Sequence, residues 1–327
     1  MNSTLKPHES MNAKCIGFLF IGNVPKQISA IPYAILVVNV LILVLTFPFT
    51  AVLNTLVMFA VRKKAQLRTV SNVALACLSA TDAMVGIFVQ PMCVYIEISS
   101  LLKRELPGKI GSCSTQIVAK YSINFFCASS LVHIALMTAE RYMAIKHTYN
   151  HSKVFTITRV LMASTAAWII TATAHILLYI DQSVFNLITS AFVGAILVFI
   201  IFSTVMVYLE SRRHAKQIAE QQVSLEAREK FLKEKKALKV STTIVFILII
   251  CYLPIMTLRV INFAFGVDKI SSISIHLIFV SSVSLALMNS FLNPLIYSVR
   301  LRQFRVAIIE IILKKNYTGA EDPGCQH

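Results

Sequence analysis

The sequence predicts an all-α membrane protein, a seven-transmembrane helix bundle, on three observations. Hydrophobic residues make up 56% of the 327 residues and charged residues only 14%, with a mean hydropathy of +0.71. A soluble domain of this length could not bury so much apolar surface, so the membrane is the expected solvent. Charge is nearly absent from seven long stretches, and a strand-like alternation of apolar and polar residues is absent as well.

Each of the seven stretches reaches the ~17–25 residues that a helix needs to cross a bilayer. Only Asp82 breaks one of them. A spanning segment must satisfy its own backbone hydrogen bonds, and without strand periodicity this favours helices over a barrel. The stretches are 27–61, 69–96, 121–139, 160–180, 182–209, 240–258 and 270–299. The connection 211–238 has no Pro or Gly and is rich in helix formers, so we expect it to extend spans five and six into the cytoplasm.

The distribution of Lys and Arg predicts the orientation. With residue 1 outside, the inner segments hold 22 of the 31 basic residues, which places the C-terminal tail in the cytoplasm. The net charge of +16 then lies against the anionic inner leaflet, and no nucleic-acid partner is expected. The expected divisions are an extracellular N-terminal segment 1–30, a membrane domain 31–299, and a cytoplasmic segment 300–327. Because the start of the chain is polar, we expect the first span to act as the insertion signal.

Two modifications are expected on the outer side. Asn2 lies in an Asn-x-Ser/Thr sequon, whereas the sequons at Asn150 and Asn316 fall inside, where glycosylation does not occur. Cys15 and Cys113 are the two cysteines external enough to form a disulfide, and their pairing is left open.

Polar side chains within the spans are costly in hydrocarbon, so each is a candidate functional residue. Taken singly, each of these residues is better explained as forming a hydrogen bond between helices than as part of a functional site. Taken together, they would enclose a small hydrated pocket for a cation, such as an allosteric sodium ion, with Asp82 as its only formal charge. The residues are Asn54, Asp82, Ser130, Asn289, Ser290 and Asn293.

Pro254 and Pro294 lie inside spans six and seven. Each removes a helix hydrogen bond and predicts a kink, which is either static or a hinge for movement of the cytoplasmic end.

Six motifs on six spans resemble the rhodopsin-like class A family of G-protein-coupled receptors. The resemblance covers nearly the whole chain, in the family's order. The motifs are Asn54 with Val57, LSATD ending at Asp82, ERY at 140–142, Trp168, CYLP at 251–254, and NSFLNPLIY at 289–297 followed by RLRQFR. The stretch 300–312 is similar to the short amphipathic cytoplasmic helix that follows the last span in this family.

The resemblance implies a switch at the inner face. Arg141 would be held by Glu140 and by Glu234 at the base of span six, and agonist binding would free it for the G protein as span six swings outward. Tyr142 completes this motif. Alternatively, Arg141 only reaches out to lipid phosphate. Tyr208 and Tyr297 would support the open state through hydrogen bonds.

The partners implied by the resemblance are a heterotrimeric G protein, arrestin, an extracellular ligand and membrane lipid, at the plasma membrane. Several family features are replaced or absent. Tyr252 stands where span six usually has Trp, Leu248 where Phe is common, and 186–209 lacks the usual Pro. The loop near 179–186 is also very short and contains no cysteine. Together with the missing Pro, this makes the chain resemble the melanocortin-type branch of the family.

Single residues narrow the range of ligand classes that the chain could bind. By the same resemblance, a retinal Lys would fall at Leu287 and an amine-binding Asp at Ile123, so we expect neither retinal nor an ordinary amine. Lys120 and Arg259 would suit a carboxylate or phosphate, unless both extend to the outer interface. The candidate ligand-binding residues are Gln90, Glu97, Lys120, Ile123, Asn124, Arg259 and Asn262.

Two other classes of membrane protein fit the sequence less well. A seven-span secondary transporter would show repeated halves and Gly-rich breaks, but no repeat is visible and the chain has only nine Gly. An intramembrane enzyme would need a catalytic Ser/His/Asp or metal-ligand set, and none is evident, so no enzymatic activity and no cofactor besides sodium is expected.

Overall fold

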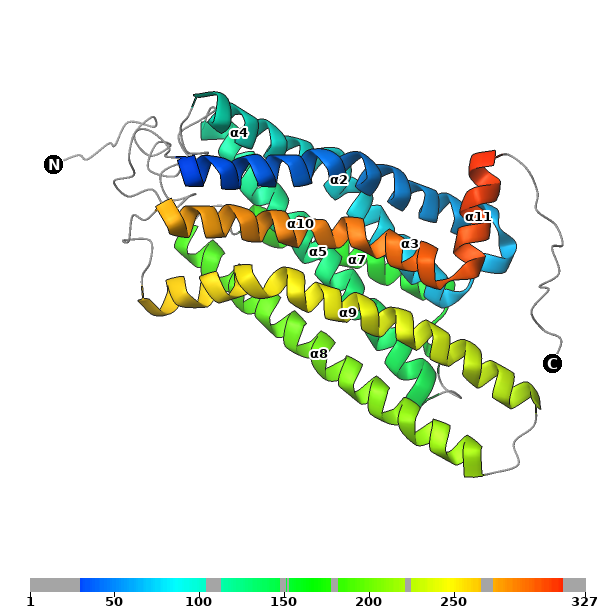
Figure 1. Cartoon of the computed structure of the whole chain (residues 1–327). Coiled ribbons are helices and arrows are strands. Elements are labelled where there is room, and N and C mark those ends of the chain that lie inside the picture. The colour runs from blue at the N-terminus through cyan, green and yellow to red at the C-terminus, as the bar shows by residue number, and fades with distance from the viewer. Residues whose placement is uncertain are drawn as a thin grey trace.

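The computed structural model describes residues 30–103, 113–147, 151, 153–177, 182–220, 225–265 and 273–313, which are largely helical and include no strand. In this part of the chain, seven segments are long and apolar enough to cross a membrane, and they form an elongated bundle (Figure 1). The predicted architecture is confirmed. The helices are α2 Ala30–Lys63, α3 Val70–Met84, α4 Gln90–Lys103, α5 Cys113–Lys146, α7 Ile157–Leu177, α8 Gln182–Glu220, α9 Leu225–Phe265, α10 Ile273–Arg300 and α11 Arg302–Leu313.

The second span consists of α3, a π-helical turn Val85–Val89, and α4. It begins at Thr69, whose side chain accepts a hydrogen bond from the backbone N–H of Asn72 at 3.3 Å. The π turn comes just before Pro91, which has no N–H to donate and whose ring crowds the preceding turn. Gly86, within the turn, lets α2 come close, because a Cβ there would lie only 2.6 Å from the Ala51 nitrogen.

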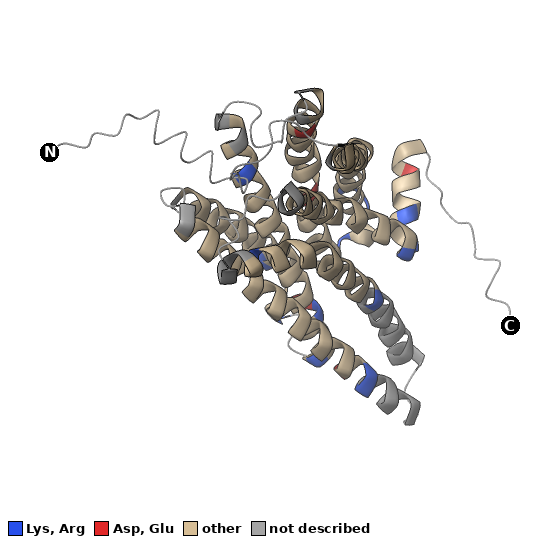
Figure 2. Cartoon of the chain, turned by 60° about the vertical axis from the view of Figure 1, so that its left-hand side comes forward, with Lys and Arg blue, Asp and Glu red and all other residues tan. Residues whose placement is uncertain are grey.

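Helices α9 and α10 continue through their prolines, Pro254 and Pro294. Helix α8 runs to Glu220 and α9 starts at Leu225, so the predicted helical extension of spans five and six is confirmed. The two extensions lie side by side and project beyond the rest of the bundle (Figure 1). In the part of these two helices that Figure 2 colours, uncharged residues predominate, and most Lys and Arg lie on the side of the projecting ends.

Helix α11 turns across the same end of the bundle (Figure 1). Its Phe304, Ala307 and Ile308 are 1%, 4% and 8% exposed and join one core cluster with Tyr297. Lys64 forms an ion pair with Glu310 of this helix at 2.5 Å. The amphipathic helix expected at 300–312 is therefore present, with its apolar face packed on the bundle.

The surface of the bundle is apolar where lipid would cover it. Ile170 of α7, Phe202 of α8 and Phe246 of α9 are each more than 60% exposed. In water such a surface would drive aggregation, whereas in a bilayer it matches the solvent.

Candidate functional site

The first candidate site is a polar cluster around Asp82, at the middle of the bundle. Its carboxylate is fully buried on α3. It accepts hydrogen bonds from Ser130 Oγ of α5 at 3.2 Å, from Ser290 Oγ of α10 at 2.7 Å and from Asn293 Nδ2 at 2.8 Å. Four of the predicted cation-site residues therefore meet in space. Asn54 of α2 joins them, because its Nδ2 donates to the Ser290 backbone carbonyl at 2.9 Å.

Several buried oxygens around this cluster have no hydrogen-bond partner among the described residues. They belong to four side chains, and Asn289 leaves both of its amide atoms unpaired. Unpaired polar atoms in a bundle core are expected to bind water or an ion. Carboxylate, amide and hydroxyl oxygens are the ligands that hard cations prefer. The unpaired oxygens are Asn54 Oδ1, Asn289 Oδ1, Asn293 Oδ1 and the Tyr297 hydroxyl.

The second candidate site lies near the C-terminal end of α5, where Glu140 and Arg141 form the expected pair. Arg141 Nε and Nη2 lie 2.6 and 2.8 Å from the two carboxylate oxygens of Glu140. Glu140 is 0% exposed and Arg141 only 8%. This burial argues against the alternative in which Arg141 reaches out to lipid.

Two further residues contact Glu140, and sequence reasoning missed both. Ser71 Oγ at the start of α3 donates to Glu140 Oε1 at 2.9 Å, and His151 Nε2 lies 2.9 Å from the same oxygen. No motif or spacing signals these contacts, because Ser71 and His151 are 69 and 11 residues away.

The other predicted switch residues differ in burial and in the contacts that they make. Tyr252 is 4% exposed and packs between α5, α8 and α10. The hydroxyl of Tyr142 accepts a hydrogen bond from Lys146 Nζ at 2.6 Å. Tyr208 is 50% exposed on α8 with its ring against Arg212, so it does not meet the buried Tyr297. The side chain of Glu234 lies outside the described residues, so its pairing with Arg141 stays a prediction.

The third candidate site lies toward the other end of the bundle, around Arg259 of α9. Its Nη2 donates to Asn124 Oδ1 at 2.8 Å and its Nη1 to Ser190 Oγ at 3.2 Å. Asn124 Nδ2 donates in turn to the backbone carbonyl of Lys120 at 2.9 Å. Lys120 is only 7% exposed, and its ammonium lies 5.6 Å from the ring of Phe185. Arg259 of α9 and Lys120 of α5 are thus linked through Asn124, and Ser190 and Phe185 of α8 border the same region.

The remaining ligand candidates do not join this cluster through any described hydrogen bond. Gln90 and Glu97 are buried on α4, where Gln90 Nε2 lies 3.5 Å from Thr46 Oγ1 and Glu97 Oε2 has no described partner. Ile123 packs in the apolar cluster that also holds Leu287. The side chains of Asn262 and Cys113 lie outside the described residues, as do Asn2 and Cys15 entirely, so these predictions stay open.

The chain matches the model of the 7 transmembrane receptor (rhodopsin family) over residues 53–190 and 179–297. The dog Canis lupus familiaris adenosine receptor A2a is 25% identical over 293 residues, covering 79% of this chain and 68% of that receptor. Trace amine-associated receptor 5 of the mouse Mus musculus is 24% identical over 349 residues, covering 99% and 98%. The histamine H1 receptor of Bos taurus is 29% identical over 119 residues, covering 36% and 23%.

These matches do not support the melanocortin-type likeness, which stays a prediction. They extend over the same spans that carry the buried Asp82 cluster and the Glu140–Arg141 pair. The chain belongs to the rhodopsin family of seven-transmembrane receptors.

Proposed function

We propose that this receptor binds an extracellular ligand within the helix bundle and activates heterotrimeric G proteins through an outward movement of α9 at the inner face. The observation that carries the proposal is the buried Glu140–Arg141 pair at the end of α5. A guanidinium held this way is released only if its surroundings rearrange, so the pair can distinguish two states of the bundle.

The orientation proposed is an extracellular N-terminus and a cytoplasmic C-terminus in the plasma membrane. The 22 inner basic residues support it, and they would also favour the anionic inner leaflet. Arrestin is proposed as a second cytoplasmic partner, by the family resemblance alone.

The proposed ligand carries a carboxylate or phosphate that pairs with Arg259 and Lys120. Some relatives are named for amine ligands, such as the trace amine-associated and histamine receptors. Here Ile123 supplies no carboxylate for an ammonium, whereas the buried Lys120 and the half-buried Arg259 favour an anion.

A sodium ion is proposed as an allosteric ligand of the Asp82 cluster. Asp82, Ser130, Asn289 and Asn293 would hold it, because the carboxylate and the unpaired amide oxygens fit a hard cation. Bound there, the ion would tie α3, α5 and α10 together.

The experiment that tests the proposed function is nucleotide exchange on added G proteins by the native chain and by Arg141→Ala. We expect Arg141→Ala to lose at least ~90% of coupling, since its charge is the contact offered to the G protein, while surface expression stays near native. Arg212→Ala, at an exposed cation of α8, is the matched control and should keep coupling. Solute uptake without nucleotide exchange in the native chain would support the transporter alternative instead.

A further inference from the structure

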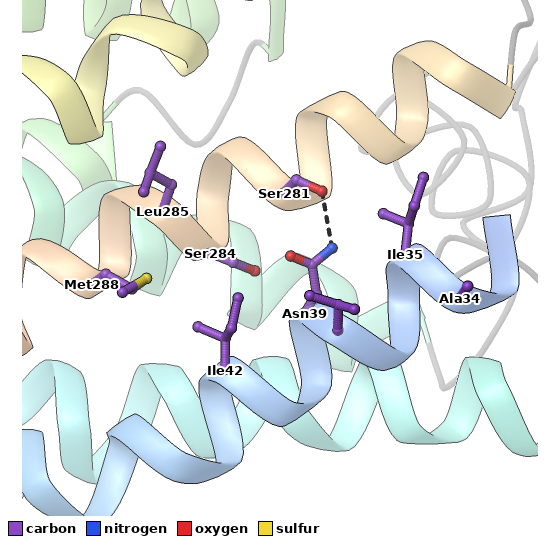
Figure 3. A pocket seen from close by; sticks show the side chains of 9 residues that line it. Ala34, Ile35, Asn39, Ile42, Ser281, Ser284, Leu285 and Met288 are labelled. Atoms are coloured by element: carbon purple, nitrogen blue, oxygen red, sulfur yellow. Dashed lines mark hydrogen bonds between the residues drawn. The ribbon is translucent and has the colours of Figure 1, made fainter. Parts of the chain in front are cut away.

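A groove between α2 and α10 lies apart from the three sites described above (Figure 3). Its volume is about 440 Å³, within the range of small-molecule sites. Apolar side chains form most of its wall, and the three polar residues among them are Asn39, Ser281 and Ser284. The residues that matter here are Ile35, Val38, Asn39 and Ile42 of α2 with Ser284 and Met288 of α10.

The groove opens toward lipid rather than toward water. Ile35 and Val38, on its rim, are 36% and 55% exposed, and both belong to the span Tyr33–Lys63. A molecule that enters here therefore arrives from the bilayer.

The floor of the groove holds an unsatisfied polar group. Asn39 and Ser284 are 4% and 2% exposed. Asn39 Nδ2 donates to Ser281 Oγ at 2.9 Å, whereas Ser284 Oγ has no partner among the described residues. The amide oxygen of Asn39 is turned toward the Ser284 hydroxyl (Figure 3). A hydroxyl buried in an apolar setting without a hydrogen bond is unfavourable, so this pair is poised for a ligand that both donates and accepts.

The depth of Asn39 matches the polar boundary of a bilayer. The span Tyr33–Lys63 has 31 residues, which as a helix is about 46 Å long against roughly 30 Å of hydrocarbon. A centred span leaves about 8 Å at each end in the headgroup region, and Asn39 lies about 9 Å from Tyr33. The polar pair is thus near the level of lipid hydroxyl and ester groups, with Ile42 and Met288 deeper.

We propose that this groove binds a sterol, whose hydroxyl lies between Asn39 and Ser284 and whose rings lie along Ile42 and Met288. None of the residues lining the groove is charged, so a phosphate headgroup finds no counter-ion there. Ser281 already accepts a hydrogen bond from Asn39, so the Asn39 amide oxygen and the Ser284 hydroxyl remain, and they suit a single hydroxyl on an otherwise apolar molecule. A rigid ring system loses less conformational entropy on binding than a flexible acyl chain, which favours a sterol over a fatty alcohol. The proposal rests on the membrane span alone and not on G-protein coupling.

The test is photolabelling of the full-length receptor in phosphatidylcholine nanodiscs with a diazirine analogue of cholesterol that keeps the free hydroxyl. Labelled peptides are mapped by mass spectrometry. We expect labels on α2 and α10 beside the groove. In Ser284→Leu the labelling should fall about tenfold, which corresponds to a loss of ~1.4 kcal/mol in the free energy of sterol binding. Val38→Trp, which blocks the groove from its exposed rim without disturbing the core, should have the same effect if the first variant folds poorly.

Thr165→Leu is the matched control, since it also replaces a hydroxyl by leucine, at an exposed position of α7. It should label as the native chain does. Excess cholesterol should compete, and its methyl ether should not. Three outcomes would each overturn the sterol assignment. The variants could all label equally, or the methyl ether could compete as well as cholesterol does. The third outcome is that a long-chain alcohol competes for labelling and cholesterol does not.

Discussion

At the residue scale, Glu140 organises the contacts near the C-terminal end of α5. It is fully buried, and its carboxylate contacts Arg141, Ser71 and His151. A buried carboxylate is tolerated only when it is paired and hydrogen-bonded, and removing one partner is costly. The helix that carries Arg141 is thereby joined to α3 and to residue 151, so the carboxylate that pairs with the arginine is itself held by residues outside α5.

His151→Ala is expected to raise basal nucleotide exchange about two- to fivefold. The change removes one contact to the buried carboxylate, a loss of about 1 kcal/mol, and loosens the state in which Arg141 is held. Basal exchange on purified G protein measures it. His147→Ala is the control, because His147 is exposed and its described ring contact is with Tyr142 rather than with Glu140. Equal basal activity in both variants and the native chain would mean that His151 does not restrain Arg141.

Asp82→Asn is expected to abolish the effect of sodium on agonist affinity. In the native chain, raising sodium at constant ionic strength should weaken agonist binding about fivefold or more, because the proposed ion would hold α3, α5 and α10 together against the agonist-bound arrangement. The asparagine keeps the size of the side chain but removes the charge that would bind the cation. Agonist competition curves in sodium and in a large organic cation provide the measurement. An unchanged sodium response in the variant would exclude this cluster as the ion site.

At the element scale, the π-helical turn of the second span shows how one local irregularity lets this span pack closely against α2. Its π turn coincides with Gly86 and precedes Pro91, and there the helix approaches α2 at backbone distance. The sequence marks the glycine and the proline, but the contact that requires them belongs to another helix.

Gly86→Ala is expected to destabilise the receptor by about 2 kcal/mol or more, because the new methyl group would clash with the Ala51 backbone rather than with a flexible side chain. Gly194→Ala should be neutral or stabilising by roughly 0.5–1 kcal/mol. Its Cβ would lie 3.9 Å from Met256 Cε, an ordinary contact, and alanine is the better helix former. Thermal unfolding in detergent compares the two. Similar melting temperatures would show that α2 can move away from Gly86 at little cost.

At the scale of the whole molecule, two polar regions lie at opposite ends of one bundle, joined by helices that run its full length. Arg259 and Pro254 belong to α9, whose N-terminal end projects beyond the rest of the bundle (Figure 1). Displacement of a contact at Arg259 can therefore reach that projecting end, which is the proposed inner face, through one continuous helix.

An agonist is expected to increase the distance between the inner ends of α5 and α9. Spin labels at His147→Cys and Lys239→Cys suit this measurement, because both positions are exposed. Labels at the C-terminal end of α2 and the N-terminal end of α3, where Val61 and Val73 belong to one core cluster, serve as the reference pair and should move little. A fixed α5–α9 distance under conditions that change nucleotide exchange would contradict the proposed switch.

The sequence by itself determined the seven spans, the helical extensions of α8 and α9, and the amphipathic α11. These follow from apolar length, helix propensity and periodicity, which are local properties of the chain. It also pointed to the Asp82 cluster, since polar residues in hydrocarbon must find one another. Only the tertiary structure placed Ser71 and His151 on Glu140, turned Tyr208 outward, and left Ser284 unpaired in a groove. Those outcomes depend on which faces of packed helices meet, and no single segment encodes that.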